Sequence, residues 1–221
     1  LASSSEQLLA DDTEQVTQLL DKLRAQGGGT IDLVVDNAGF ELCTDLLLAD
    51  HLVGSGAAKS VRFRVKHHPT FVSDELERDV DAHIAELAKG DGAAASVARR
   101  WKDRRAKGEF VCVADTYWAM PYALWDIPQS LYDHLRDSSS LIVVKGDANY
   151  RRALGDRPWP LDAPFADVCS YAPSPSSCSR TLQAEPGCGM AKPGPDRDRQ
   201  TTGPFAGHKC ASYQSYGEVI R

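Results

Sequence analysis

The sequence is dominated by an alternation between short, β-branched apolar runs and longer segments whose apolar residues have helical spacing. The short runs predict strands over residues 30–35, 61–65, 110–114 and 141–145. The longer segments predict helices over residues 5–26, 41–53, 75–89, 91–107 and 128–137. Strands that alternate with helices in this way form a parallel sheet with helices on both faces. We therefore predict an α/β fold of three layers, α/β/α, with a mainly parallel sheet.

The last quarter of the chain has a different composition. Residues 165–221 contain only five Ile, Leu, Val or Met residues, but four of the six cysteines. In a segment with so few apolar side chains, the free energy gained by burial offsets little of the conformational entropy lost on folding. The first 164 residues are therefore expected to carry the core.

Charge and hydropathy argue against several classes of partner. The net charge of −6 disfavours a nucleic-acid surface, because phosphate binding depends on clustered Lys and Arg. The chain has no run of about 18 apolar residues, and its first residues lack the basic and apolar regions of a signal peptide. The cysteines have neither a secretory context nor the close pairs of a zinc site, so free thiols are expected. We therefore expect a cytoplasmic protein, with the nucleus as the alternative, and no nucleic-acid or membrane partner.

Polar side chains follow three of the predicted strands. Asp36 and Asn37 follow the first strand, Asp74 lies beyond the second, and Asp147 follows the fourth, with Asn149 two residues later. Ligands of doubly wound sheets bind beyond the carboxyl ends of the strands, so we expect these side chains to lie close together. Two carboxylates and an amide oxygen form a hard, oxygen-only ligand set that suits Mg²⁺ or Mn²⁺.

Each of these residues also has a structural interpretation. Asp36 and Asn37 can cap the helix that follows them, and Asp74 can cap the next helix, because Asp and Asn are favoured N-caps. Asp147 can be a turn residue. For each residue taken singly, the structural interpretation is favoured over a functional site. The coincidence of three acidic strand ends makes the two interpretations equally favoured.

Other groups near these strand ends leave their role open. Lys145 and Arg151 flank the end of the fourth strand, where they can bind a phosphate group or be solvated. The aromatic stretch 117–122 can line a sugar pocket, although packing is its commoner role. His67 and His68 lack the spacing of helical metal ligands, so we expect them to be exposed.

Three segments carry a resemblance to a known family. They are DNAGFEL at residues 36–42, FVSD at residues 71–74 and KGDANYR at residues 145–151. In this order they resemble the motifs of the metal-dependent damage-control phosphatases, over about residues 12–165. The most similar group is the one also described as acidic-residue (protein-glutamate) methyltransferases.

The resemblance implies a three-layer α/β/α domain that binds Mn²⁺, or Ni²⁺, Co²⁺ or Mg²⁺ in its place. By motif match, Asp36, Asn37 and Asp74 would be the metal ligands. Asp147 would be the catalytic proton-transfer group. The substrate-binding residues would be Asp36, Asn37, Glu41, Asp147, Ala148, Asn149, Tyr150, Arg151, Arg180 and Gln183.

The activity implied is the hydrolysis of small-molecule sugar phosphates such as fructose 1-phosphate and fructose 6-phosphate. Two alternatives stay open. One is transfer by an S-adenosylmethionine-dependent protein-glutamate O-methyltransferase. The other is an inactive truncated product.

The chain departs from the family pattern in two places. The late motif Arg-Thr-x-Lys is present as residues 180–183, where Gln183 replaces a lysine expected to contact phosphate, and the apolar strands expected around it are missing. The helical region before Asp36 is far longer in the family. These departures divide the chain into residues 1–29 as a remnant of that helical region, 30–164 as the metal-binding catalytic domain, and 165–221 as a poorly ordered or aberrant segment.

Overall fold

A computed structural model describes residues 10–181, residue 188 and residues 211–215 of the chain. Its α-helices are α2 (Thr13–Ala25), α3 (Phe40–Gly54), α4 (Glu77–Ala88), α5 (Gly92–Ala106), α6 (Gln129–Ser138), α7 (Asp147–Leu154) and α8 (Phe165–Val168). Two short 3₁₀ helices are η1 (Thr116–Ala119) and η2 (Leu124–Asp126). The strands are β1 (Gly29–Val34), β2 (Ala58–Lys66), β3 (Phe110–Asp115), β4 (Leu141–Lys145), β5 (Ser176–Thr181) and β6 (Ala211–Ser215).

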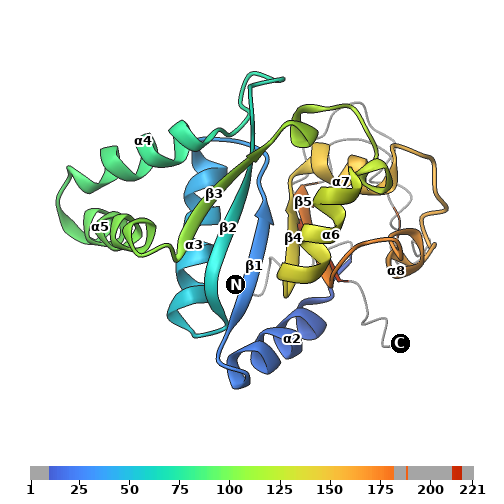
Figure 1. Cartoon of the computed structure of the whole chain (residues 1–221), viewed down its shortest axis with the longest axis horizontal. Coiled ribbons are helices and arrows are strands. Elements are labelled where there is room, and N and C mark those ends of the chain that lie inside the picture. The colour runs from blue at the N-terminus through green and yellow to red at the C-terminus, as the bar shows by residue number, and fades with distance from the viewer. Residues whose placement is uncertain (1–9, 182–187, 189–210, 216–221) are drawn as a thin grey trace, which may run out of the picture.

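These strands form one sheet with the order β3-β2-β1-β4-β5-β6 (Figure 1). Strands β1 to β5 pair in parallel, and β6 pairs with β5 in the antiparallel direction. The chain builds outward from β1 to β3 and then returns to place β4 on the other side of β1. The strand order therefore reverses between β1 and β4, which is where ligands bind in doubly wound sheets.

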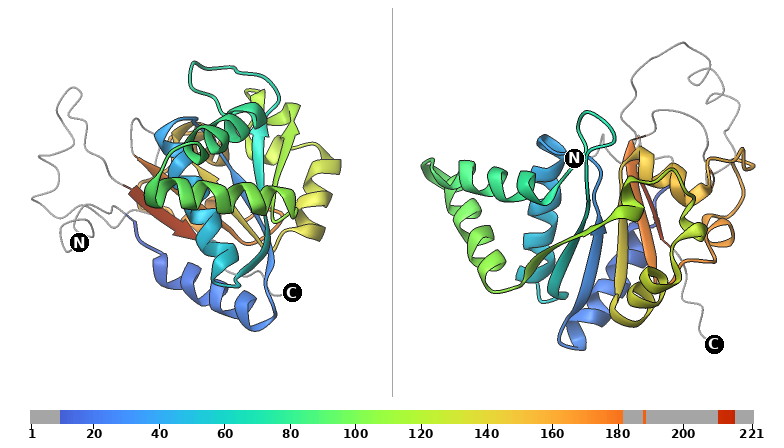
Figure 2. Two further views of the ribbon diagram at one scale, coloured as in Figure 1. Left: turned by 90° about the vertical axis from the view of Figure 1, so that its left-hand side faces the viewer. Right: turned by 45° about the horizontal axis from the view of Figure 1, so that its top comes forward.

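Two apolar clusters cover the two faces of the sheet and confirm the three-layer α/β/α prediction. The first cluster contains Ile31 and Leu33 of β1 and Val35, which directly follows β1. It also contains residues of α3, α4 and α5. Val34 faces the second cluster, together with α6, α7 and α8. This period of two follows from the pleat of a strand, and Figure 2 shows the helical layers from two further directions.

The alternating sequence of β2 places charged side chains on the second face of the sheet. Val61 and Phe63 are fully buried in the first cluster, whereas Arg62 and Arg64 point to the opposite face. There Arg62 and Arg64 both bind the carboxylate of Asp32, which is itself 0% exposed. The same alternation continues to Lys66, the last residue of β2, and so places a third cationic side chain at the carboxyl end of this strand.

Three elements differ from the sequence prediction. Residues 147–154 form helix α7, so the interpretation of Asp147 as a turn residue was wrong. Strand β5, which contains Arg180 and pairs with β4, was not predicted; it has a single apolar residue, Cys178, and so is not one of the apolar strands expected around this motif. Helix α2 begins at Thr13, and the first residues of the predicted helix 5–26 lie outside the described residues.

The segment after residue 164, predicted to be poorly ordered or aberrant, contributes to the core. Its elements α8 and β5 supply buried residues of the second cluster, among them Phe165 and Cys178. The division of the chain into three parts stays a prediction. In the part of the chain that the structure describes, no helix is both long enough and apolar enough to cross a membrane.

Candidate functional site

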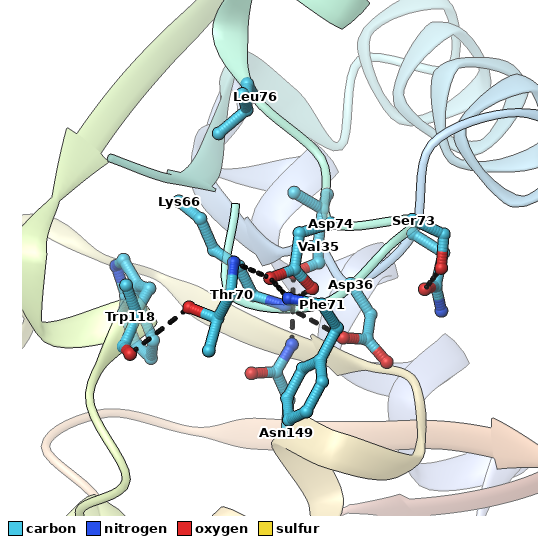
Figure 3. A network of polar contacts seen from close by, with 12 residues as sticks. Val35, Asp36, Lys66, Thr70, Phe71, Ser73, Asp74, Leu76, Trp118 and Asn149 are labelled. Carbon is cyan, nitrogen blue, oxygen red and sulfur yellow. Dashed lines mark hydrogen bonds and ion pairs between the residues drawn. The ribbon is translucent and has the colours of Figure 1, made fainter. Parts of the chain in front are cut away.

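The segments after β1 and β2 bring Asp36, Asn37 and Asp74 together at the point where the strand order reverses. Asp36 and Asn37 follow β1, and an isolated antiparallel bridge pairs Asn37 with Asp74. Two backbone hydrogen bonds support this bridge: Ala38 donates to Ser73 at 2.8 Å, and Glu75 donates to Asp36 at 3.2 Å. The loop after β2 therefore returns to the end of β1, as the sequence analysis predicted for these residues (Figure 3).

Lys66 lies between the two carboxylates of this site. Its Nζ is 3.4 Å from Asp36 Oδ1, and it also donates a hydrogen bond to Asp74 Oδ1. All three residues are buried, with exposed fractions of 5% for Asp36, 5% for Lys66 and 6% for Asp74. Burial raises the pKa of Asp36, which Lys66 opposes. The site therefore combines two buried carboxylates with one buried ammonium.

Asp74 is held by its own loop. Burial alone would raise the pKa of Asp74, but the hydrogen bond from Lys66 and those from two backbone N–H groups together lower it. These N–H groups belong to Thr70 and Phe71, which donate to Asp74 Oδ2 at 2.6 and 2.7 Å. The N-cap of helix α4 is Leu76, so the interpretation of Asp74 as its N-cap was wrong.

Asn37 connects the site to helix α3. Its Nδ2 donates to Glu41 Oε2 at 3.0 Å, and its Oδ1 accepts a hydrogen bond from Ser73 Oγ at 2.7 Å. The N-cap of α3 is Gly39, with no side-chain cap, so the interpretation of Asp36 and Asn37 as caps was wrong. Glu41, a predicted substrate-binding residue, therefore lies beside a predicted metal ligand.

The end of β4 approaches Asp36 very closely. Gly146 has a φ of +81°, and a Cβ built on it would lie 2.1 Å from Asp36 Oδ2. Asp147 follows as the first residue of α7. Asn149 is 3% exposed, and its Nδ2 donates to the carbonyl groups of Val35 and Lys145, at 3.0 Å each. The predicted substrate-binding residue Asn149 thus ties β1 to β4 directly behind the site.

The remaining predicted substrate-binding residues of α7 point in different directions. Ala148 is exposed. Tyr150 is 1% exposed and its ring stacks on Phe165 in the second apolar cluster, so the structure does not bring this ring to the carboxylates. Arg151 is partly exposed and pairs with Asp156 at 2.8 Å.

The segment from Arg180 to Gln183 lies only partly within the described residues. The backbone of Arg180 belongs to β5 and pairs with β6. Gly146 donates a backbone hydrogen bond to Ser179 at 3.0 Å, so β5 passes beside the end of β4. The side chain of Arg180 and the whole of Gln183 lie outside the described residues.

Four charged residues near the site were missed by the sequence analysis. One is Lys66, and a second is Arg152, whose guanidinium donates to Asn149 Oδ1 at 2.8 Å. The others are Asp45 and Glu75, two buried carboxyls behind the site. The only signal for Lys66 was that it continues the alternation of β2, and α7 itself was not predicted as a helix.

Burial raises the pKa values of both hidden carboxyls. The pKa of Glu75 rises to about 9, because the residue is buried and nearby acidic groups add to the effect. Both of its carboxyl oxygens are buried without a hydrogen-bond partner. The pKa of Asp45 rises to about 6, although Asp45 Oδ1 lies 3.1 Å from Lys145 Nζ. Behind the site there are therefore two carboxyls for which burial favours the neutral, protonated form.

The donor chemistry of this site fits a hard divalent ion. Among the described residues, no three His, Cys, Asp or Glu side chains converge as a metal-binding group. The carboxylates of Asp36 and Asp74 meet at Lys66. Asn37 is joined to Asp74 through the backbone, while its side-chain amide bonds Glu41 and Ser73. Carboxylate and amide oxygens suit Mg²⁺ or Mn²⁺ better than zinc. His67 and His68 are exposed, as expected, and add no nitrogen ligand to this set.

The strand order and this oxygen-rich site define a doubly wound α/β protein with a candidate site for a divalent ion. Comparison with known proteins identifies the family: the model of the damage-control phosphatase ARMT1-like domain matches residues 1–197, and the chain belongs to that family.

Relatives with the name damage-control phosphatase ARMT1 show the same relationship. The chain is 34% identical to the one from Danio rerio over 195 residues, which covers 83% of this chain and 43% of the relative. It is 35% identical to the one from Homo sapiens over 187 residues, which covers 80% of this chain and 42% of the relative. The chain thus spans less than half the length of these relatives.

Proposed function

We propose that this chain is a metal-dependent phosphatase that hydrolyses sugar phosphates such as fructose 1-phosphate and fructose 6-phosphate. The observation that carries the proposal is that the carboxylates of Asp36 and Asp74 both contact Lys66 where the strand order reverses, beside the backbone bridge from Asn37 to Asp74. The names of the relatives support the phosphatase class.

The proposal assigns the divalent ion to Asp36, Asn37 and Asp74, with Mn²⁺ as the first choice and Ni²⁺, Co²⁺ or Mg²⁺ as alternatives. A divalent ion bound there supplies a Lewis acid that polarises phosphoryl oxygens. Asp36 and Asp74 balance the charge of such an ion, so the ammonium of Lys66, which contacts both, leaves the site with a net charge of +1 for an anionic substrate.

The start of α7 supplies the other parts of the proposed site. Asp147 is the first residue of this helix, and in the proposal it transfers a proton to the oxygen of the departing sugar. Arg151 lies one turn later and is partly exposed, so its guanidinium can reach a bound phosphate. Glu41, held by Asn37 at 3.0 Å, borders the same space from α3.

The test is phosphate release from fructose 1-phosphate by the full chain in the presence of Mn²⁺. We expect Asp36→Asn and Asp74→Asn to lower this release by about 100-fold or more, because each removes a charged metal ligand. Asp21→Asn is the matched control, since Asp21 is an exposed residue of α2 that pairs with Arg24, away from the site. Release that persists in both site variants would contradict the metal assignment.

A second measurement separates the proposal from its alternatives. Mn²⁺ should raise the melting temperature of the wild-type chain but not of Asp36→Asn, because a ligand of the native state stabilises it. Methyl transfer from labelled S-adenosylmethionine without phosphate release would favour the methyltransferase. A folded chain with neither activity and no response to Mn²⁺ would favour an inactive product.

A further inference from the structure

The ammonium of Lys66 is placed where a bound cation would also interact. Lys66 is the last residue of β2, and its side chain crosses from that strand to the acidic residues beyond β1. The exposed fraction of Lys66 is 5%, so its positive charge is neutralised by protein groups and not by water. The groups that do so are Asp36 and Asp74, the two charged ligands of the proposed metal site.

Each carboxylate offers the ammonium one oxygen and keeps the other for a different neighbour. Asp36 Oδ1 faces Lys66 Nζ, while Asp36 Oδ2 lies against Gly146. Asp74 Oδ1 accepts from Lys66, while Asp74 Oδ2 accepts from the backbone of Thr70 and Phe71. The ammonium therefore contacts one oxygen of each carboxylate and lies between the two residues.

We propose that Lys66 is a positioning residue that sets the affinity of this site for divalent cations, by acting as an internal counter-ion between Asp36 and Asp74. This inference rests on the proposed function. Lys66 holds the two carboxylates together without a metal ion, and its charge opposes a divalent ion that binds the same pair. Lys66 touches neither a reacting atom nor a substrate in this role.

Charge balance gives the direction of the effect. With Lys66 present, the charges of Asp36, Asp74 and the ammonium add to −1, whereas without it the two carboxylates carry −2. Carboxylates that are buried without a counter-ion destabilise the fold. A divalent ion compensates that charge. Loss of Lys66 should therefore lower the stability of the metal-free protein and raise its affinity for the ion.

The neighbouring lysine shows that this arrangement is specific to Lys66. Lys145 ends β4, the strand on the other side of β1, and its ammonium pairs with Asp45 at 3.1 Å. Asp45 belongs to α3 and is not one of the proposed ligands. Lys66 thus pairs with two proposed ligands, whereas Lys145 pairs with a carboxylate outside the proposed ligand set.

The experiment compares the full-length wild type with Lys66→Met, which removes the charge, and Lys66→Gln, which removes the charge but keeps a hydrogen-bond donor. Lys59→Met is the control, since Lys59 is an exposed lysine near the other end of β2. Free Mn²⁺ is measured by electron paramagnetic resonance during titration at pH 8, and melting temperatures are measured with and without Mn²⁺.

We expect both Lys66 variants to melt at a lower temperature than the wild type without metal, and to bind Mn²⁺ about tenfold more tightly. Their melting temperature should therefore rise more with Mn²⁺ than that of the wild type, and Lys59→Met should match the wild type. Folded variants whose Mn²⁺ affinity is unchanged or weaker would overturn the proposal. Variants that stay unfolded in Mn²⁺ would also overturn it, because the ion should replace the ammonium.

This outcome is independent of the outcome for the proposed function. Mn²⁺ binding is measured without a sugar phosphate, so a chain that binds Mn²⁺ but releases no phosphate contradicts the phosphatase and not the role of Lys66. Conversely, a chain that releases phosphate while the Lys66 variants bind Mn²⁺ no more tightly contradicts the role of Lys66 alone.

Discussion

Gly146 and Asp36 approach so closely that no side chain fits between them: a Cβ at position 146 would lie 2.1 Å from Asp36 Oδ2. Gly146 also has a φ of +81°, a conformation that other residues rarely adopt. This contact joins the end of β4 to the end of β1, and so it holds a proposed metal ligand against the start of α7. Glycine is required here for two separate reasons, space and backbone conformation.

The first prediction is that Gly146→Ala destabilises the protein and displaces Asp36. The positive φ costs about 1–2 kcal/mol for alanine, and overpacking costs about 1–3 kcal/mol more. Gly92→Ala is the matched control, because Gly92 has the same φ of +81° but nothing within 4 Å of its Cβ position. Urea unfolding and Mn²⁺ titration check the result, and equal losses in the two variants would show that the contact with Asp36 is unimportant.

The second prediction concerns Arg152, which connects α7 to the loop after β3. Its guanidinium donates to Asn149 Oδ1 at 2.8 Å and to the carbonyl groups of Trp118 and Met120 at 3.0 and 2.9 Å. It also lies over the ring of Tyr117, at 5.5 Å from the centroid. We expect Arg152→Met to lower the free energy of unfolding by about 2–4 kcal/mol, since the acceptors of two buried residues, Asn149 and Trp118, lose this donor.

Its neighbour provides the comparison. Arg151 pairs with Asp156 at the surface, where both side chains are more than a third exposed. Such pairs contribute about 0–1 kcal/mol, so Arg151→Met should hardly change unfolding in urea. If the proposed function holds, Arg151→Met should instead raise KM for the sugar phosphate. A larger loss of stability in Arg151→Met than in Arg152→Met would contradict both assignments.

The parallel sheet could be predicted from the sequence because β1 and β4, its central strands, are short runs rich in apolar, β-branched residues. Strand β5 could not, because Ser176–Thr181 contains a single apolar residue, Cys178. Its strand conformation depends on hydrogen bonds to the neighbouring β4, which local composition does not reveal. Helix α7 was missed for a similar reason, since it has only eight residues and follows directly after β4.

The acidic part of the site could be predicted because Asp36, Asn37 and Asp74 follow strand ends, and parallel strand ends meet at one edge. Lys66 could not, because an alternating strand such as β2 is typical of a sheet with one solvated face. That face is in fact covered, and Asp32 of another strand neutralises the arginines on it. The burial of Lys66 depends on these tertiary contacts.

The third prediction is a dependence of stability on pH that originates at Asp45. Asp45 is 1% exposed, and burial raises its pKa from 3.8 to about 6 in spite of Lys145. Between these two pH values the folded protein keeps a proton that the unfolded chain has lost. The contribution of Asp45 to stability therefore decreases as pH rises from 3.8 to about 6, by about 3 kcal/mol in total.

Asp45→Asn removes this titration and keeps the size of the side chain. We expect the variant to gain about 3 kcal/mol relative to the wild type between pH 4 and pH 7, because only the wild type has to ionise a buried carboxyl. Urea unfolding at intervals of one pH unit measures the difference, with the exposed Asp21→Asn as a control that should show no such trend. A relative stability that falls with pH would mean that the ion pair with Lys145 outweighs burial, and that the pKa of Asp45 is lowered instead.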